Sequence, residues 1–372
     1  MTERRKVWIA IDQMGVGGVG RSLARWLPEM AAIADVTVVS QMTEDGIFRE
    51  AFAKHAEIFH PRDDAHLLRR LREDRPAAFV NNLVGGYVPL TPEIRKHVPW
   101  LSCILHTADL WSLSMVAPEI APLYDAVSVV AEGQASIVQG HCQVPVRCVE
   151  NIIALPAYEA VSKDALRASL GLPAGAFLFG YVGRPSPDKG LEHAAPIVAR
   201  LVALGVDAHF VFVGASEQGL GAITDRRGIE DSRVKTSFAK LGIRNRLHVY
   251  GAREDVGAFY QAMDATLLLS QHEGAPLMPW ESLWFGTPFI ATAVGDIPDW
   301  FDPDIGSVLL AGSLDLVSDT TEALVQIHQR KPRTIAKYRT AGKSLCQKHK
   351  GIDQWRQRYG ANLAILLGVA NT

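Results

Sequence analysis

The sequence predicts an α/β protein made of two doubly wound domains that face a cleft. The first observation is that short apolar runs alternate with helical patterns, which indicates βαβ units and a parallel sheet. The second is that this pattern restarts after a Pro/Ala-rich stretch at residues 154–157. We therefore expect one domain at residues 1–155 and another at residues 156–354, with the ligand site in the cleft between them.

Each expected strand is a short, mostly apolar run. In the first domain the runs are residues 6–11, 36–40, 78–82, 101–106 and 126–130, with helical patterns at 21–28, 51–56 and 65–73. In the second domain a short helix at 163–170 precedes runs at 177–183, 208–214, 247–251, 265–269 and 288–291. A last helix, at about residues 355–372, carries Trp355, Tyr359 and Leu363 at helical spacing, which indicates a core-facing side.

Composition and charge exclude several classes of protein. A net charge of −2 gives no indication of wholesale nucleic-acid binding. Four cysteines without C-x-x-C spacing argue against a zinc site and a disulfide framework. No apolar run reaches the roughly 18 residues of a membrane span, and the N-terminus lacks the apolar core of a signal peptide. We expect a cytoplasmic protein, with peripheral contact to the inner face of the membrane left open.

Two glutamates eight residues apart, Glu273 and Glu281, provide the strongest functional indication. Glu273 follows an apolar run at residues 263–270, so it lies where open α/β sheets bind ligands, at a strand's carboxyl end. A helix that begins near Pro276 would offer free N–H groups to an anion and carry Glu281 about one turn inside. Such spacing more commonly indicates two glutamates on a solvated helix, but the flanking strands favour a ligand-binding site.

The loop at residues 183–190 carries Arg184 and Lys189 directly after the first strand of the second domain. An arginine and a lysine this close can converge on one anion, with the guanidinium contributing a planar fork and the ammonium a point charge. A solvated basic loop explains the spacing equally well. Such a pair is suited to neutralising a diphosphate.

A glycine-rich turn, residues 15–20, follows the first strand and satisfies the G-x-G-x-x-G spelling, with Arg21 expected to open the helix. A dinucleotide site would require an acidic residue at the end of the second strand, and that strand ends without one. A tight strand-to-helix turn is the alternative explanation.

His106 ends an apolar strand of the first domain, and Asp109, three residues later, could orient it. A histidine at this position points toward the ligand-binding edge of the sheet. A lone histidine is nevertheless more often a satisfied structural residue.

Four separated motifs together resemble the retaining glycosyltransferases of the GT-B fold, the glycogen-synthase-like group (glycosyltransferase family 4, group 1 type). They are Gly17-Gly18, His106 at a strand end, Gly-Arg-x4-Lys-Gly at 183–190, and Glu-x7-Glu with Gly-x-Pro at 273–281. The resemblance covers most of the chain. It implies two Rossmann-like domains and a last helix that crosses back onto the first domain. The chain departs from the family at Asp296 and Asp299, where Gly and Glu are usual.

The resemblance also implies roles for individual residues. His106 and Glu273 would lie beside the reacting sugar, and Glu281 would bind the ribose hydroxyls. The donor diphosphate would contact Gly17, Gly18, Arg184, Lys189, Gly274, Ala275, Pro276 and Leu277, the last four through their loop and the helix start. No metal site is expected.

The function that follows is transfer of a hexosyl or related group from a nucleotide-diphosphate sugar to a glycan, lipid-linked or other hydroxyl acceptor. The resemblance implies a retaining reaction without metal or cofactor, with polysaccharide biosynthesis as the commonest setting. Two alternatives stay open. One is a catalytically silent glycan- or nucleotide-binding scaffold, and the other is a different nucleotide-sugar or dinucleotide enzyme. The sequence does not indicate an oligomeric state.

Overall fold

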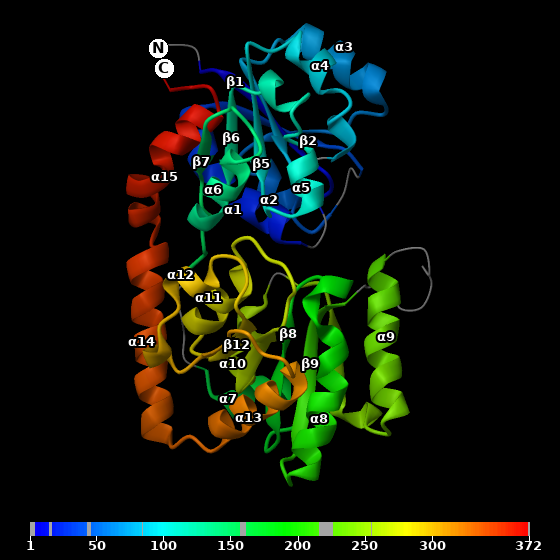
Figure 1. Ribbon diagram of the computed structural model, residues 1–372, viewed down its shortest axis with the longest axis vertical. Coiled ribbons are helices and arrows are strands. Elements are labelled where there is room, and N and C mark those ends of the chain that lie inside the picture. The colour runs from blue at the N-terminus through cyan, green and yellow to red at the C-terminus, as the bar shows by residue number, and fades with distance from the viewer. Residues whose placement is uncertain are drawn as a thin grey trace. The chain divides into compact units, whose positions relative to one another are not determined.

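The computed structural model describes residues 4–14, 17–42, 46–83, 85–156, 161–215, 226–253 and 255–370, with backbone alone for residues 215 and 226–231. It divides into two compact units, seen in Figure 1. Unit 1 comprises Met1–Ile152 and Ile352–Thr372, and unit 2 comprises Ile153–Gly351. Each boundary lies three residues before the position expected from the sequence. Each unit is a parallel α/β sheet with flanking helices, which confirms the predicted fold class.

Unit 1 contains a seven-stranded sheet in the order β3-β2-β1-β4-β5-β6-β7, and every paired strand is parallel. The strands are β1 (Lys6–Ile11), β2 (Asp35–Ser40), β3 (Glu57–Phe59), β4 (Ala78–Asn82), β5 (Trp100–Leu105), β6 (Ala126–Val129) and β7 (Val146–Cys148). Five of the six residues in β1 and in β2 are buried, as expected for strands covered on both faces.

The helices of unit 1 are α1 (Gly18–Ile33), α2 (Arg49–Ala53), α3 (Asp64–Asp74), α4 (Thr91–Arg95), α5 (Leu110–Ser114), α6 (Glu132–Gln139) and α15 (Ile352–Leu366). Helix α15, red in Figure 1, lies beside β6 and β7 although more than 200 residues separate them in sequence. The indole of Trp355 donates to the carbonyl of Glu150 over 2.6 Å, and the hydroxyl of Ser102 donates to the carbonyl of Leu366 over 2.7 Å. Buried Trp355, Tyr359 and Leu363 form its core-facing side, as the spacing predicted.

Unit 2 contains a six-stranded parallel sheet in the order β10-β9-β8-β11-β12-β13. The strands are β8 (Phe177–Val182), β9 (Ala208–Ala215), β10 (Leu247–Gly251), β11 (Ala265–Leu268), β12 (Phe289–Thr292) and β13 (Val308–Leu310). The helices are α7 (Lys163–Ser169), α8 (Ala194–Ala203), α9 (Arg226–Lys240), α10 (Gly257–Ala262), α11 (Leu277–Trp284), α12 (Ile297–Trp300), α13 (Leu316–His328) and α14 (Pro332–Lys350). All six residues of β8 are buried, because the strand lies in the middle of the sheet.

Several boundaries differ from the sequence-based expectation. The first helix begins at Gly18 rather than Arg21, and Gly17 is its N-cap. The helix expected at residues 51–56 is α2, at Arg49–Ala53. The last helix begins at Ile352, three residues before the expected position. The sequence also missed the three-residue edge strands β3, β7 and β13, which are too short to show a periodic pattern.

The described part of the chain holds no helix with both the length and the apolar composition that crossing a membrane requires. Cys103, Cys142, Cys148 and Cys346 are buried free thiols. Burial raises the pKa of Cys103 and of Cys346 to about 12, so both are neutral at physiological pH.

The packing of α15 on unit 1 predicts the effect of a cavity. The Leu363 side chain is 2% exposed. Leu363→Ala should therefore lower the free energy of unfolding of unit 1 by about 2–4 kcal/mol. Differential scanning calorimetry, which resolves the transitions of separate units, measures this change. Leu314→Ala is the matched control because Leu314 is fully exposed, and equal effects of the two variants would contradict the packing described.

Candidate active site

The candidate site of unit 2 lies where the strand order of its sheet reverses. Strands β8 and β11 are neighbours, and the chain proceeds from β8 toward β10 on one side and from β11 toward β13 on the other. Open α/β sheets bind ligands outside the carboxyl ends of their strands at such a switch point. The loop after β8 carries Arg184 and Lys189, and the loop after β11 carries Glu273.

Lys189 joins these two loops. Its Nζ donates to Glu273 Oε1 over 2.9 Å and lies 2.9 Å from Asp188 Oδ2. The hydroxyl of Ser270 donates to the same Glu273 oxygen over 2.7 Å. We call these four residues the Lys189 cluster. Because an ammonium has three N–H donors, one donor of Lys189 stays available to a ligand.

The electrostatics of the cluster keep its lysine charged. Burial acts to lower the pKa of Lys189, but Glu273 and Asp188 outweigh it and the net pKa is raised. For Asp188, burial acts to raise the pKa, but the adjacent Lys189 ammonium helps to lower it overall. The structure thus holds a cation between two carboxylates before any ligand binds.

Arg184 differs from Lys189 in being exposed. Its backbone carbonyl accepts a hydrogen bond from the Tyr181 hydroxyl over 3.0 Å, which fixes the main chain of the loop. Among the described residues, no carboxylate forms an ion pair with the Arg184 guanidinium. The guanidinium is therefore available to bind an anion from solution.

Helix α11 begins directly after the Glu273 loop. It starts at Leu277 with Pro276 as N-cap, close to the predicted start, and no side chain caps it. Pro276 and Pro279 have no N–H, so the first turn exposes the N–H groups of Leu277 and Met278, which lack an intrahelical acceptor. Two parallel N–H groups and the positive end of the helix dipole favour an anion at this position.

Backbone contacts fix the loop between Glu273 and α11. The N–H of Asp296 donates to the carbonyl of Gly274 over 2.9 Å. Gly295 has φ +60°, and a Cβ there would lie 2.3 Å from the same carbonyl oxygen. Asp296, one of the two residues at which the chain departs from the family motif, thus contacts the candidate site. Glycine is required at 295.

Glu281 lies inside α11 as expected, but it is 3% exposed. The hydroxyl of Tyr260, from α10, donates to Glu281 Oε2 over 2.9 Å. Its predicted contact with ribose hydroxyls stays a prediction.

Unit 1 has its own switch point between β1 and β4. Gly17 and Gly18 follow β1 at the start of α1, and a Cβ at either position would meet no atom within 4 Å. Both leave open space in which a ligand could approach the backbone. Gly15 lies outside the described residues, so the complete G-x-G-x-x-G turn is not described.

His106 follows β5 and lies beside Asn82, the last residue of β4. Its Nε2 is 2.8 Å from Asn82 Oδ1, and its ring centroid is 5.8 Å from that of Trp26. Burial lowers the pKa of His106 to about 3, so the imidazole is neutral at physiological pH. With Asn82 Oδ1 as acceptor, Nε2 carries the proton and Nδ1 presents a lone pair.

The suggestion that Asp109 orients His106 is wrong. The Asp109 carboxylate accepts from the N–H of Ser112 over 2.7 Å and from the Thr107 hydroxyl over 3.0 Å, so it caps α5 instead. Aspartate is a preferred residue at such caps, so the free N–H groups at the start of α5 bind the carboxylate in place of the His106 ring. Asn82 holds the imidazole.

Sequence reasoning also missed Asp188, Ser270 and Tyr260 as partners of the predicted site residues. Asp188 is adjacent to Lys189, and Ser270 ends the apolar run before Glu273, so both had a local signal. Tyr260 had none, because it reaches Glu281 from another helix. Over the described ranges, no three His, Cys, Asp or Glu side chains are grouped as metal ligands.

The ion pair of Lys189 predicts a pH-dependent stability. Its folded-state pKa is raised above 10.5, so its stabilising contribution is complete below pH 10.5 and is lost as pH rises through the folded value. Lys189→Met should lower the free energy of unfolding of unit 2 by about 2–3 kcal/mol at pH 8, with a smaller difference at pH 11. Denaturant unfolding at both pH values measures this. Lys348→Met, an exposed lysine of α14, is the control, and a pH-independent difference would contradict the assignment.

Part of the chain, fewer than half of its residues, matches the model of a known family. Residues 162–334 match the family model described as glycosyl transferases group 1. A 2-deoxystreptamine glucosyltransferase of Streptomyces kanamyceticus is 30% identical over 151 residues, covering 40% of this chain and 36% of the relative. A D-inositol 3-phosphate glycosyltransferase of Xylanimonas cellulosilytica is 31% identical over 195 residues, covering 50% and 42%. The chain spans less than half the length of these curated relatives.

Solved structures resemble the chain over nearly its whole length. HepE of Anabaena in complex with UDP and glucose has a TM-score of 0.80 at 15% identity and covers 97% of this chain and 100% of that chain. Sucrose-phosphate synthase of Thermosynechococcus elongatus has a TM-score of 0.77 at 17% identity and covers 99% and 100%. At such identities the likeness shows the fold, two Rossmann-like units of the GT-B type. The family match, residues 162–334, lies within unit 2.

Proposed function

We propose that this chain transfers a sugar from a nucleotide-diphosphate donor to a hydroxyl group of an acceptor, such as a glycan or a lipid-linked glycan. The observation that carries the proposal is the anion site at the switch point of unit 2. There Arg184, Lys189 and the first turn of α11 surround the carboxyl ends of β8 and β11. A guanidinium, an ammonium and the free N–H groups at a helix start are groups that bind a diphosphate.

The diphosphate is the leaving group in this reaction, and negative charge grows on it as the bond to the sugar breaks. Arg184 and the free donor of Lys189 stabilise that charge, as does the pair of N–H groups at Leu277 and Met278. These donors supply the positive charge that a divalent ion supplies in other enzymes. We therefore propose a metal-independent reaction without a cofactor.

Glu273 is suited to bind the transferred sugar. It is hydrogen bonded to Lys189 over 2.9 Å, so a sugar whose diphosphate contacts Lys189 presents its hydroxyls to the adjacent carboxylate. Ionised carboxylates accept hydrogen bonds at both oxygens. Glu281, about one turn inside α11, is proposed to receive the ribose hydroxyls alongside the hydrogen bond from Tyr260.

Similar proteins support a nucleotide-sugar donor. HepE of Anabaena has been solved in complex with UDP and glucose and with UDP-glucose. The curated relatives are named as a glucosyltransferase and a glycosyltransferase. For this chain we propose a nucleotide-diphosphate sugar without specifying its base or sugar.

We propose that unit 1 binds a hydroxyl group of the sugar or of the acceptor. Neutral His106 presents Nδ1 as an acceptor for a hydroxyl, while Asn82 fixes the opposite ring nitrogen. Such an imidazole positions a hydroxyl and does not serve as a proton donor near pH 7. From the family resemblance we also propose retention of the anomeric configuration, with the leaving phosphate assisting deprotonation of the acceptor.

The donor site is tested by thermal stabilisation with a panel of UDP-, GDP- and ADP-sugars. A donor that binds the native state raises the melting temperature. At a donor concentration 100 times the dissociation constant, the free energy of unfolding rises by about 2.7 kcal/mol. Arg184→Ala should weaken donor binding roughly 10- to 100-fold, because a charge-assisted contact to phosphate is lost. Arg200→Ala, an exposed arginine of α8, should leave the shift unchanged.

Release of free nucleotide diphosphate in the same samples separates an enzyme from a silent scaffold. An active enzyme slowly hydrolyses its bound donor, whereas a scaffold that binds the donor releases no product. Full stabilisation of Arg184→Ala by the donor would refute the diphosphate site.

Metal independence and stereochemistry are tested in one reaction. With the donor identified and an acceptor supplied, turnover in excess EDTA should equal turnover with added Mg²⁺ or Mn²⁺, because protein cations hold the diphosphate. Proton NMR of the product should show the donor's anomeric configuration. Loss of turnover in EDTA, restored by a divalent ion, would overturn metal independence. A product with the inverted anomeric configuration would overturn retention.

A further inference from the structure

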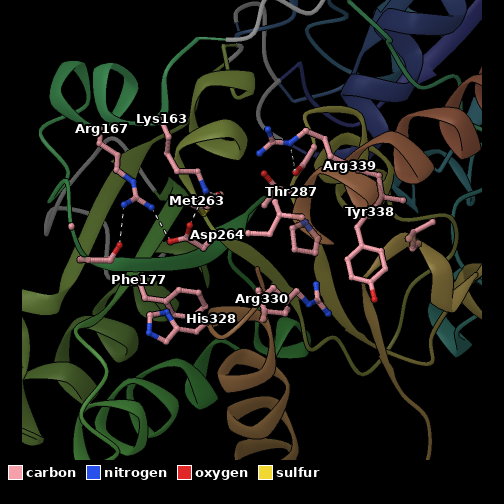
Figure 2. A pocket seen from close by; sticks show the side chains of 18 residues that line it. Lys163, Arg167, Phe177, Met263, Asp264, Thr287, His328, Arg330, Tyr338 and Arg339 are labelled. Atoms are coloured by element: carbon pink, nitrogen blue, oxygen red, sulfur yellow. Dashed lines mark hydrogen bonds and ion pairs between the residues drawn. The ribbon is translucent and has the colours of Figure 1, made fainter. Parts of the chain in front are cut away.

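One unexplained feature of unit 2 is a cavity of about 270 Å³ at the edge of the sheet opposite to the Lys189 cluster. It is bordered by residues at the amino-terminal ends of the strands, including Phe177 at the start of β8, Asp264 before β11 and Pro288 before β12. We call it the basal cavity. Figure 2 shows its lining side chains. Its volume is just below the ~300 Å³ at which small-molecule sites begin.

The lining carries an excess of positive charge. Lys163, Arg167, Arg330 and Arg339 face a single carboxylate, that of Asp264. A structural cavity wall of this composition would be expected to pair its charges, since uncompensated charge in a partly dry site is unfavourable. Two of the four cations, Arg167 and Lys163, form ion pairs with Asp264.

Arg167 and Asp264 form a satisfied structural pair. Arg167 Nη2 donates to Asp264 Oδ2 over 2.8 Å, and its other nitrogens donate to the carbonyls of Ala174, Ala176 and Ala262. Lys163 shares the same carboxylate, donating to Asp264 Oδ1 over 2.7 Å. The bonds between Asp264 and its two cations appear as dashed lines on one side of Figure 2. Among the described residues of the lining, Asp264 is the only acidic group, and this network occupies it.

Arg330 and Arg339, on the other side of Figure 2, lack such a partner. Arg330 donates to the carbonyl of Gly306 over 2.5 Å and lies 4.9 Å from the centre of the Tyr338 ring. Arg339 Nε donates to the carbonyl of Gly286 over 3.3 Å. Within the described part of the chain, neither forms an ion pair with a carboxylate. Each guanidinium keeps N–H donors beyond these single carbonyl contacts.

The charges also act on one another. Burial lowers the pKa of Arg330. Burial likewise lowers the pKa of Lys163, Asp264 opposes this, and repulsion from Arg167 and Arg339 adds to the lowering. An anion in the cavity would relieve this repulsion between Lys163 and Arg339.

Apolar side chains form the rest of the lining. Leu283, Ile305 and Ile327 contribute aliphatic surface, and the Phe177 ring packs edge-on against His328 with centroids 4.9 Å apart. A ligand that uses the whole cavity therefore combines a charged end with an apolar or aromatic body.

We propose that the basal cavity binds a small phosphomonoester, with its phosphate between Arg339, Arg330 and Lys163 and its body against Phe177 and the aliphatic residues. A dianionic phosphate matches the excess of cations better than a carboxylate, and arginine binds phosphate oxygens through a bidentate fork. The site is independent of the proposed donor site, because it lies at the opposite edge of the sheet and shares none of its residues.

The test uses phenyl phosphate as the probe and isothermal titration calorimetry of the full chain at pH 8, where the phosphate is a dianion. Binding is expected, and Arg339→Gln and Arg330→Gln should each weaken it roughly 10-fold or more. Arg333→Gln removes the same charge from an exposed position of α14 outside the cavity and should leave the affinity unchanged. Phenol and inorganic phosphate, which each lack one half of the probe, should bind at least 10-fold more weakly.

Arg184→Ala separates this site from the donor site. Unchanged binding of phenyl phosphate to Arg184→Ala, together with weakened binding to Arg339→Gln, supports the proposal. The proposal is overturned if the chain does not bind the probe, or if Arg184→Ala abolishes binding while Arg339→Gln retains it. Equal affinity for phenol or for inorganic phosphate also overturns it, since one half of the lining would then contribute nothing.

Discussion

The ion pair between Lys189 and Glu273 is the constraint on which the candidate site of unit 2 depends. It connects the loop after β8 to the loop after β11, which leave the sheet on either side of its switch point. Asp188 and Ser270 hold the pair from both sides, so the cation and the carboxylate are already placed 2.9 Å apart. A preorganised pair needs little rearrangement when a charged ligand arrives. Arg184, exposed and without a carboxylate partner in the described structure, contributes charge without that preorganisation.

Much of the fold could be predicted from the sequence because both sheets are parallel. Strands covered on two faces are continuous apolar runs, and β1 and β8 show this directly. Edge strands such as β13 have three half-buried residues, so neither length nor alternation identifies them. The start of α1 was placed three residues late because Gly17 caps the helix without a side-chain hydrogen bond, which leaves no recognisable capping residue.

The candidate site was predictable where its residues follow strand ends, as Lys189, Glu273 and His106 do. The partners that fix them were not, because those contacts join segments far apart in sequence. Asn82 reaches His106 across 24 residues, and Tyr260 reaches Glu281 across 21. A local pattern contains no information about either pair. For Asp109 the sequence suggested a contact that does not form. Its carboxylate is close to His106 in sequence, but it caps the nearest helix instead, which is the stronger local interaction.

The two edges of the unit 2 sheet compensate charge in different ways. At the carboxyl edge, Lys189 is balanced by two carboxylates, so a ligand there exchanges one set of contacts for another. At the amino edge, Asp264 is shared by Lys163 and Arg167, and Arg330 and Arg339 rest on carbonyl groups. A hydrogen-bonded path leads from the basal cavity to Glu281: Thr287 donates to the carbonyl of Tyr260, whose hydroxyl donates to Glu281. Tyr260 is held at both ends and stacks on Phe285 at 5.9 Å. A residue fixed in this way has a single arrangement, whereas coupling between two sites requires an element with two alternative arrangements. The path therefore stiffens the unit without coupling the proposed donor site to the basal cavity, so a variant at one edge should affect ligand binding at that edge alone.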